Sequence, residues 1–244
     1  TRRSSDLNAG QTEPISMAVI LANGPLLDPD GTIRKNAVLQ KKGYAQQTYN
    51  NDYRFANAPY APKLTAIPGD NKVTLYWDDE AERSFDTYID NIGGNGSDFE
   101  GYRIYRASDP AFLDAKVITN AQGSPTYLLP IAQFDLEDGI KGYDSLGFEG
   151  VHFNLGDDTG LQHSWVDTDA KNGFTYYYAI TSYDFGYNPG GITPSECNIN
   201  ISLKSDGSLK SIGKNVAKIT PEAAAGGYTP PSVQIGRASC RERV

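Results

Sequence analysis

The sequence predicts an all-β protein built as a sandwich of antiparallel sheets. Its 244 residues include 25 Gly, 14 Pro and 16 Tyr, a composition typical of short strands joined by many turns. The clearest strand spans 173–184, where both alternating sets of residues are largely apolar or aromatic. Successive side chains of a strand point to opposite faces, so both faces of this one are expected to be covered. We place it in the middle of a sheet, with a second sheet packed on the side of Tyr176, Tyr178 and Ile180.

Short runs of alternating apolar residues, bounded by turn residues, predict the other strands of the sandwich. They span 63–68, 73–77, 99–106, 164–168 and 196–203. The residues that face inward by alternation form the predicted core: Trp77, Tyr102, Ile104, Trp165, Tyr176, Tyr178 and Ile180. This domain covers 62–203 and includes a long insertion, 107–160, which we expect to form extra hairpins or a subdomain.

The segments on either side of the sandwich have different patterns. Residues 1–50 contain an alternating run at 14–22 and helical spacing at 32–49, so we interpret them as the C-terminal fragment of an upstream domain. Residues 51–61 are rich in Asn, Ala and Pro without periodicity, which indicates a linker. Residues 204–234 are expected to be an extended tail or a linker to a following domain.

Both ends of the chain indicate a fragment of a longer product. The sequence begins Thr1-Arg-Arg, without Met or a signal peptide, and its last ten residues, 235–244, resemble one reading frame of a common sequencing adapter. We therefore exclude 235–244 from the fold. Cys197 is then the only cysteine, and no intrachain disulfide is expected.

Charge and hydropathy argue against two classes of partner. The net charge is −8, and Lys and Arg are scattered without forming a basic stripe, so nucleic acid is not an expected partner. The longest apolar run, 15–22, is far shorter than the ~18 residues of a membrane-spanning helix. No membrane span is expected in this segment.

Four motifs together resemble strands B, C, E and F of a bacterial fibronectin type III domain, which has an immunoglobulin-like sandwich fold. They are Leu75-Tyr-Trp77, Gly101-Tyr-Arg-Ile-Tyr-Arg106, Trp165-Val-Asp-Thr168 and Tyr176-Tyr-Tyr-Ala-Ile180. The resemblance implies that Trp77 is a core residue and that the Tyr176 hydroxyl bonds to backbone just upstream, as in the tyrosine corner. The domain departs from the family in length, because such sandwiches have about 100 residues.

A wider resemblance links the chain to large multidomain surface or secreted proteins of environmental, metagenomic, Bacteroidota-like bacteria. It is carried by the runs 98–106, 132–135, 150–156 and 224–231. This resemblance implies a cell-surface or extracellular location and a structural or interaction role beside neighbouring domains of the same chain.

The sequence holds no pattern of catalytic residues, so we do not expect an enzyme. Ser164 follows His163, but triad members must converge in space, and no Gly-x-Ser-x-Gly nucleophile elbow is present. No organic cofactor is indicated.

Two groups of residues deserve comparison with metal sites. His152 and His163 flank Asp157 and Asp158, but their spacing matches no zinc motif, and ordinary strand-edge histidines are the expected alternative. The second group surrounds a glycine-rich loop and could gather around a structural Ca²⁺, although we favour a solvated acidic loop; its members are Asp86, Asp90 and Asp98.

Aromatic residues on the outer face of the sandwich give the one candidate ligand site. By alternation, the outward-facing residues are Tyr76, Tyr105, Tyr177 and Tyr183. Exposed aromatic rings would suit a carbohydrate-binding accessory module of an extracellular hydrolase, with a polysaccharide as partner. The alternative, which we favour, is that the insertion and residues 204–234 pack over this face.

Overall fold

The computed structural model describes residues 56–120, 123–147, 150–224 and 226–227, together with a few single positions before residue 56. The chain divides into two units, 1–55 and 56–244, and the description below concerns the second. Of the strand expected at 14–22 only Val19 is described, outside any strand, and the described positions within 32–49 are helical. Residues 235–244 lie outside the described part.

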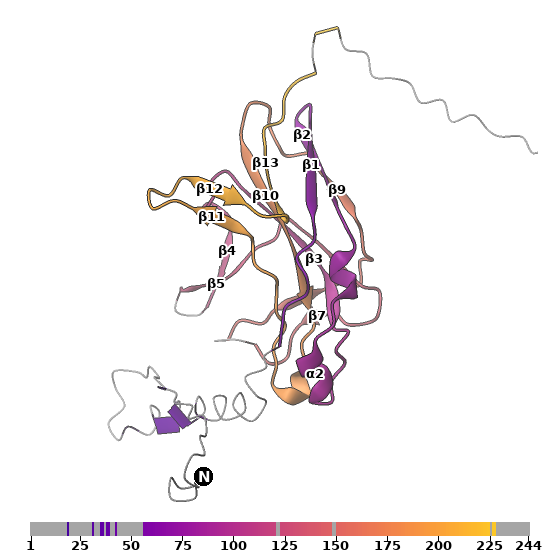
Figure 1. The fold of residues 1–244 in the computed structure, drawn as a ribbon, viewed down its shortest axis with the longest axis vertical. Coiled ribbons are helices and arrows are strands. Elements are labelled where there is room, and N and C mark those ends of the chain that lie inside the picture. Colours follow the sequence, from indigo (N-terminus) through magenta and orange to yellow (C-terminus); the bar gives the residue numbers. More distant parts are fainter. Residues whose placement is uncertain are drawn as a thin grey trace, which may run out of the picture. The chain divides into compact units, whose positions relative to one another are not determined.

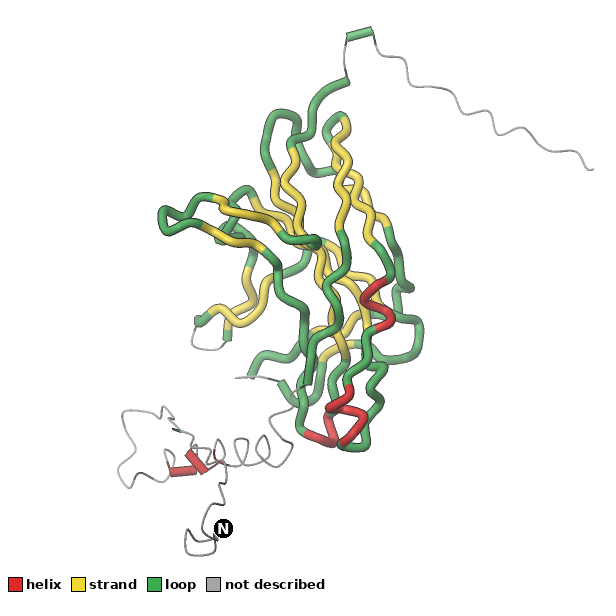
Figure 2. Tube along the Cα trace, viewed as in Figure 1, coloured by secondary structure: helices red, strands yellow, loops and turns green. Residues whose placement is uncertain are grey.

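The fold of the second unit is mostly antiparallel β-sheet with little helix (Figures 1 and 2). One sheet has the order β1-β2-β9, with β1 at Leu64–Gly69, β2 at Lys72–Trp77 and β9 at Ser164–Asp167. The other has the order β13-β10-β3-β6, with β13 at Val216–Ile219, β10 at Tyr176–Asp184, β3 at Phe99–Ala107 and β6 at Ala132–Asp135. The helical elements are short: η2 at Glu80–Arg83, α2 at Thr87–Asn91 and η3 at Asn188–Gly190.

Alternation in β2 shows why these residues form a half-buried strand. Val73, Leu75 and Trp77 are buried. Lys72, just before Val73, and Tyr76, between Leu75 and Trp77, are exposed. The turn that leads into β2 contains Asn71, whose φ of 49° lies in the left-handed region that Asn tolerates better than most residues.

The main core contains residues from both sheets. Its buried members are Leu64, Val73, Leu75, Trp77, Ala81, Phe99, Tyr102, Ile104, Phe134, Ala170, Tyr178 and Ile180. The Trp77 ring is 5.9 Å from the rings of Phe134 and Tyr102, in stacked and edge-on arrangements respectively. The predicted core is therefore confirmed for five of its residues, while Trp165 and Tyr176 are partly buried and pack against it.

The last strand of the four-stranded sheet is not where the sequence predicted it. We expected it at 196–203, with an extended tail after it, but the strand paired with β10 is β13. Residues Ile201–Leu203 form β11, which pairs with β12, Leu209–Ile212, in a separate hairpin. The physical reason is that Ile199 and Ile201 pack with Tyr105 and Tyr177, away from the main core.

The insertion forms hairpins, as expected, and also supplies an edge strand. Its first hairpin joins β4, Val117–Thr119, to β5, Pro125–Leu128, and its second joins β7, Gly142–Tyr143, to β8, Asn154–Gly156. Between them β6 pairs with β3.

The chain enters and leaves this unit at opposite ends of β10 (Figure 1). Near the end of β10, the Ser182 hydroxyl donates to the Tyr60 carbonyl at 2.8 Å. Just before its start, the Gly173 N–H donates to the Pro221 carbonyl at 2.9 Å. In the described part of the chain, no helix is long and apolar enough to cross a membrane.

Candidate functional site

The four tyrosines predicted to face outward do not form an exposed platform. Tyr76 is 45% exposed, but Tyr105, Tyr177 and Tyr183 are only 2%, 7% and 0% exposed. Tyr105 and Tyr177 pack with Phe112 of the insertion, and Tyr183 packs with residues of the second hairpin. The prediction that these three tyrosines are exposed was wrong. The alternative, that the insertion and the segment after 203 cover this face, is confirmed.

The three acidic residues considered for calcium lie in different surroundings. Asp86 caps the N-terminus of α2, where its carboxylate accepts from the N–H groups of Tyr88 at 2.7 Å and Ile89 at 3.1 Å. Asp98 is 1% exposed, whereas Asp90 is exposed. The expected alternative of a solvated acidic loop was wrong for Asp86 and Asp98, because both side chains are buried, at 2% and 1% exposed.

The two histidines are also engaged separately. His163 lies 3.2 Å from Glu82, and His152 donates from Nδ1 to the Asp144 carbonyl at 2.5 Å. Asp158 pairs with Lys141 at 2.7 Å, and the neighbouring Asp157 is exposed. Among the described residues, no group of three or more His, Cys, Asp and Glu side chains is placed to hold a metal ion.

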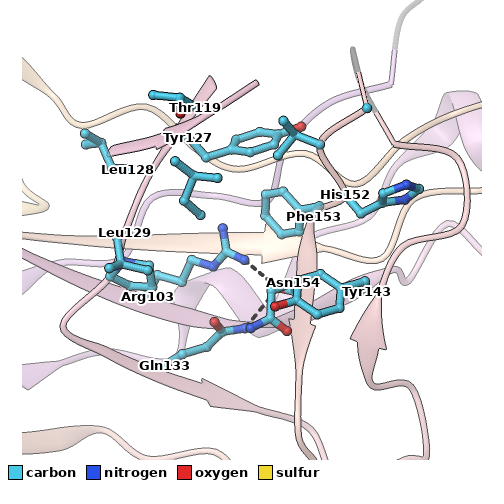
Figure 3. Close-up of a pocket in the computed structure, with 14 residues that line it drawn as sticks. Arg103, Thr119, Tyr127, Leu128, Leu129, Gln133, Tyr143, His152, Phe153 and Asn154 are labelled. Carbon is cyan, nitrogen blue, oxygen red and sulfur yellow. Dashed lines mark hydrogen bonds between the residues drawn. The ribbon is translucent and has the colours of Figure 1, made fainter. Parts of the chain in front are cut away.

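A pocket of about 660 Å³ opens on the outer side of the four-stranded sheet. Its walls come from the β4–β5 hairpin, from Gln133 on β6 and from the segment 150–154, and they are more apolar than polar (Figure 3). Its volume lies in the range of small-molecule sites. We call it the Arg103 pocket, after the buried cation that lines it.

Arg103 projects from β3 and is 3% exposed. Its Nη1 donates to Glu196 Oε2 at 3.1 Å, and its Nη2 donates to the Asn154 carbonyl. The guanidinium also lies 3.8 Å from the centre of the Phe153 ring and 4.8 Å from that of Tyr183. In Figure 3 it lies between Tyr127 and Leu128 on one side and Gln133 and Asn154 on the other.

One donor of this guanidinium has no acceptor. The Nε–H group of Arg103 is shielded from solvent and makes no hydrogen bond within the described structure. An unsatisfied buried donor costs about 1–3 kcal/mol, and more when it belongs to a charged group.

The charge of Arg103 is balanced by Glu196, whose own oxygens are fully engaged. Glu196 Oε1 accepts from the Tyr105 hydroxyl at 2.7 Å and from the Thr181 hydroxyl. Burial, and then the charge of Glu196, raise the pKa of Tyr105, so this hydroxyl remains a donor. The Arg103–Glu196 pair is thus neutral overall and fixed on the sheet.

Buried carboxyl groups form a second unusual feature, around the start of β3. Glu100 is 0% exposed, and neither carboxyl oxygen has a hydrogen-bond partner in the described part of the chain. Burial, followed by the charges of Asp138, Asp135 and Asp158, raises the pKa of Glu100 to about 8. Burial also raises the pKa of Asp98 and of Asp184 to about 7. Glu100 does not line the Arg103 pocket, so its raised pKa bears on stability rather than on chemistry with a ligand.

Sequence reasoning did not select Arg103 or Glu196. The signal for Arg103 was its position in 99–106, where alternation places it on the same face as Tyr105. Glu196 opens the segment expected to be a strand, and nothing in its immediate sequence indicates a buried partner.

No known protein family, curated protein or solved structure matches this chain.

Proposed function

We propose that residues 56–227 are a fibronectin type III-like sandwich that serves as a non-catalytic structural and interaction module of a longer bacterial cell-surface or secreted protein. In chain order, β1, β2, β3, β6, β9, β10 and β13 correspond to strands A, B, C, C′, E, F and G of such a domain. This correspondence places the insertion between strands C and E, on either side of strand C′.

A hydrogen bond at the start of β10 supports the same class. The Lys171 N–H donates to the Tyr176 hydroxyl at 3.2 Å. A tyrosine at the start of strand F that bonds to backbone a few residues upstream is the tyrosine corner of these sandwiches. This contact was expected from the resemblance, and it joins strand F to the turn before it.

The observation that carries the structural role is the path of the chain. Where the chain enters the unit, Tyr60 is hydrogen-bonded to Ser182, and where it leaves, Pro221 is hydrogen-bonded to Gly173. Ser182 and Gly173 are nine residues apart along β10 and the turn before it. At about 3.3 Å per residue, the two ends are separated by roughly 30 Å. Domains attached at both ends would be held apart along the strand direction, as a spacer requires.

The expected exposure of the tyrosines, which motivated the carbohydrate-binding alternative, is not observed. It required two or more of the predicted tyrosines to be exposed in one plane, and only Tyr76 is exposed. A rigid sandwich with its outer face covered by its own insertion is better suited to spacing and presenting neighbouring domains.

A distance measurement in the full chain tests this proposal. Spin labels would be attached to cysteines replacing Asn57 and Glu222, after Cys197→Ser and Cys240→Ser remove the native thiols. We expect one narrow distance distribution centred at roughly 30 Å or more. A broad distribution, or one centred well below that value, would contradict a rigid spacer.

A glycan array with the same chain separates the two functions. The spacer role predicts no saturable binding to any glycan. Saturable binding that is abolished by Tyr76→Ala would make the carbohydrate-binding module the better assignment.

A further inference from the structure

We propose that Asn95 is a site of spontaneous covalent modification, at which the Gly96 nitrogen attacks the side-chain amide and Asn95 becomes aspartate or isoaspartate. This inference goes beyond the spacer role, because it assigns a chemical change to the loop beside the point where the chain enters the unit. The chain contains three Asn–Gly pairs, and the structure describes two of them, Asn95–Gly96 and Asn172–Gly173. The surroundings of these two pairs differ, and the difference selects Asn95.

The reaction requires the residue pair and water, and no oxidant or cofactor. The Gly96 nitrogen bonds to Cγ of Asn95, its proton and the side-chain amide group leave as ammonia, and a succinimide ring forms. Water then opens the ring at either of its carbonyl groups. One opening gives aspartate, and the other gives isoaspartate, in which the main chain runs through Cβ. Glycine favours the first step because it has no Cβ to obstruct its nitrogen.

The attacking nitrogen and the leaving group are both available in this loop. Among the described residues, neither the Gly96 N–H nor the Asn95 side-chain NH2 donates a hydrogen bond. Asn95 is exposed, so water can reach the ring. Glycine is also required at position 96, because a Cβ there would lie 2.6 Å from the carbonyl oxygen of Asp86. The fold therefore demands the residue that makes the preceding asparagine most reactive.

A hydrogen bond at the reacting carbonyl favours the attack. Asn95 Oδ1 accepts from the Ser97 N–H at 3.1 Å. Negative charge develops on this oxygen when the Gly96 nitrogen bonds to Cγ, and a backbone N–H that is already beside it stabilises that charge. The loop thus holds the amide with a donor at its oxygen and no acceptor at its nitrogen among the described residues.

The second pair is held in the opposite way. The Gly173 N–H donates to the Pro221 carbonyl at 2.9 Å, so attack by this nitrogen would break that bond. The Asn172 amide donates to Asp70 at 2.6 Å and accepts from the Asn71 N–H at 2.8 Å. Turning this amide toward Gly173 would disrupt both contacts, which raises the barrier in the folded chain but not in the unfolded chain. The second pair should therefore react more slowly than the first.

The product should alter the contact at which the chain enters the unit. The Asp86 N–H donates to the Gly96 carbonyl at 2.7 Å, and the Asp86 carboxylate accepts from the Asn57 N–H at 2.5 Å. Isoaspartate adds one main-chain atom just before Gly96, which displaces its carbonyl from Asp86. The hold of Asp86 on Asn57 should weaken as a result.

Peptide mapping by mass spectrometry measures both pairs in one sample of the full chain, aged at neutral and mildly alkaline pH. Asn95 should convert to a mixture of isoaspartate and aspartate, with the new oxygen taken from solvent water, at least about tenfold faster than Asn172. In guanidinium chloride, where the fold is absent, the two rates should be similar. Equal rates in the folded chain, or aspartate at Asn95 without isoaspartate, would overturn the proposal.

Two variants test the contact with Ser97. Ser97→Pro removes the N–H that donates to Asn95 Oδ1, whereas Ser97→Ala keeps it. The rate at Asn95 in the folded chain, divided by the rate in the unfolded chain, should fall about fivefold in Ser97→Pro and stay unchanged in Ser97→Ala. An unchanged ratio in Ser97→Pro would refute the role of this N–H.

Amide hydrogen exchange tests the effect on the entry contact. The modified chain carries one additional negative charge, so ion exchange separates it from the unmodified chain. Exchange at the Asn57 amide should be faster in the modified chain, because its acceptor on Asp86 is held less firmly. Equal exchange in the two forms would refute the link between Asn95 and this contact.

Discussion

Replacing Glu100 by Gln should remove much of the pH dependence of stability in this protein. Glu100 is fully buried, and its carboxyl oxygens have no partner among the described residues. Its raised pKa means that the folded state binds this proton more tightly than the unfolded state does. The stability linked to Glu100 is therefore fully present below pH 4.5 and is lost as the pH rises through about 8.

The size of this effect follows from the two pKa values. A carboxyl whose pKa rises from 4.5 to about 8 on folding lowers the free energy of unfolding by roughly 4 to 5 kcal/mol once it is ionised. Gln resembles the protonated acid in shape and cannot ionise. The Glu100→Gln variant should match the wild type near pH 4.5 and exceed it by about 4 kcal/mol near pH 8.5.

Urea unfolding followed by tryptophan fluorescence measures this difference, because Trp77 and Trp165 both lie in the second unit. Glu222→Gln makes the same chemical change at an exposed site and should follow the wild-type curve at every pH. If the free energies of unfolding of Glu100→Gln and the wild type changed with pH in parallel, Glu100 would be ionised in the folded state. That result would refute the assignment of a buried neutral acid.

Two further predictions concern the packing and charge of the sandwich. Trp77→Ala should lower the free energy of unfolding by about 3–5 kcal/mol, because the ring is 5% exposed. Tyr76→Ala, at the exposed neighbouring position, should lower it by about 1 kcal/mol or less. If urea titrations gave similar losses for both variants, Trp77 would not face the core and Tyr76 would not face solvent. Arg106→Met removes the partner of the buried Asp167, 2.7 Å away, and should cost about 3 kcal/mol. Arg83→Met breaks an exposed pair and should cost less than about 1 kcal/mol, so equal effects of the two would show that burial of Asp167 is unimportant.

The inner face of the sandwich could be predicted because local alternation determines it. Val73, Leu75 and Trp77 are apolar at every second position, and a strand with that pattern has one stable way to face a core. The central strand 173–184 was recognised for the same reason, since both of its faces are apolar and both are buried. Period and residue type are sufficient for these elements.

The outer face could not be predicted, because alternation tells which side a residue points to and not what covers that side. Tyr105 and Tyr177 do point away from the main core, but Phe112 and Leu128 of the insertion pack over them. The same limit explains the misplaced last strand. Ile201 has the alternation of a strand, yet its apolar partner lies on the outer face.

Alternation along β3 is interrupted at Glu100, so the burial of this residue could not be predicted from it. The pairing of β3 with β10 shifts register between Tyr183 and Asp184, and Phe99 packs in the main core with Tyr102, so Glu100 does not continue the alternation of the strand. Arg103 is in phase with Tyr105 on the opposite face.

The two buried side chains Arg103 and Glu100 are accommodated differently. Arg103 has a carboxylate partner in Glu196 at 3.1 Å. Glu100 has no hydrogen-bond partner among the described residues, so protonation is the remaining way to avoid a buried charge. A change of pH should therefore alter the stability of the sandwich through Glu100.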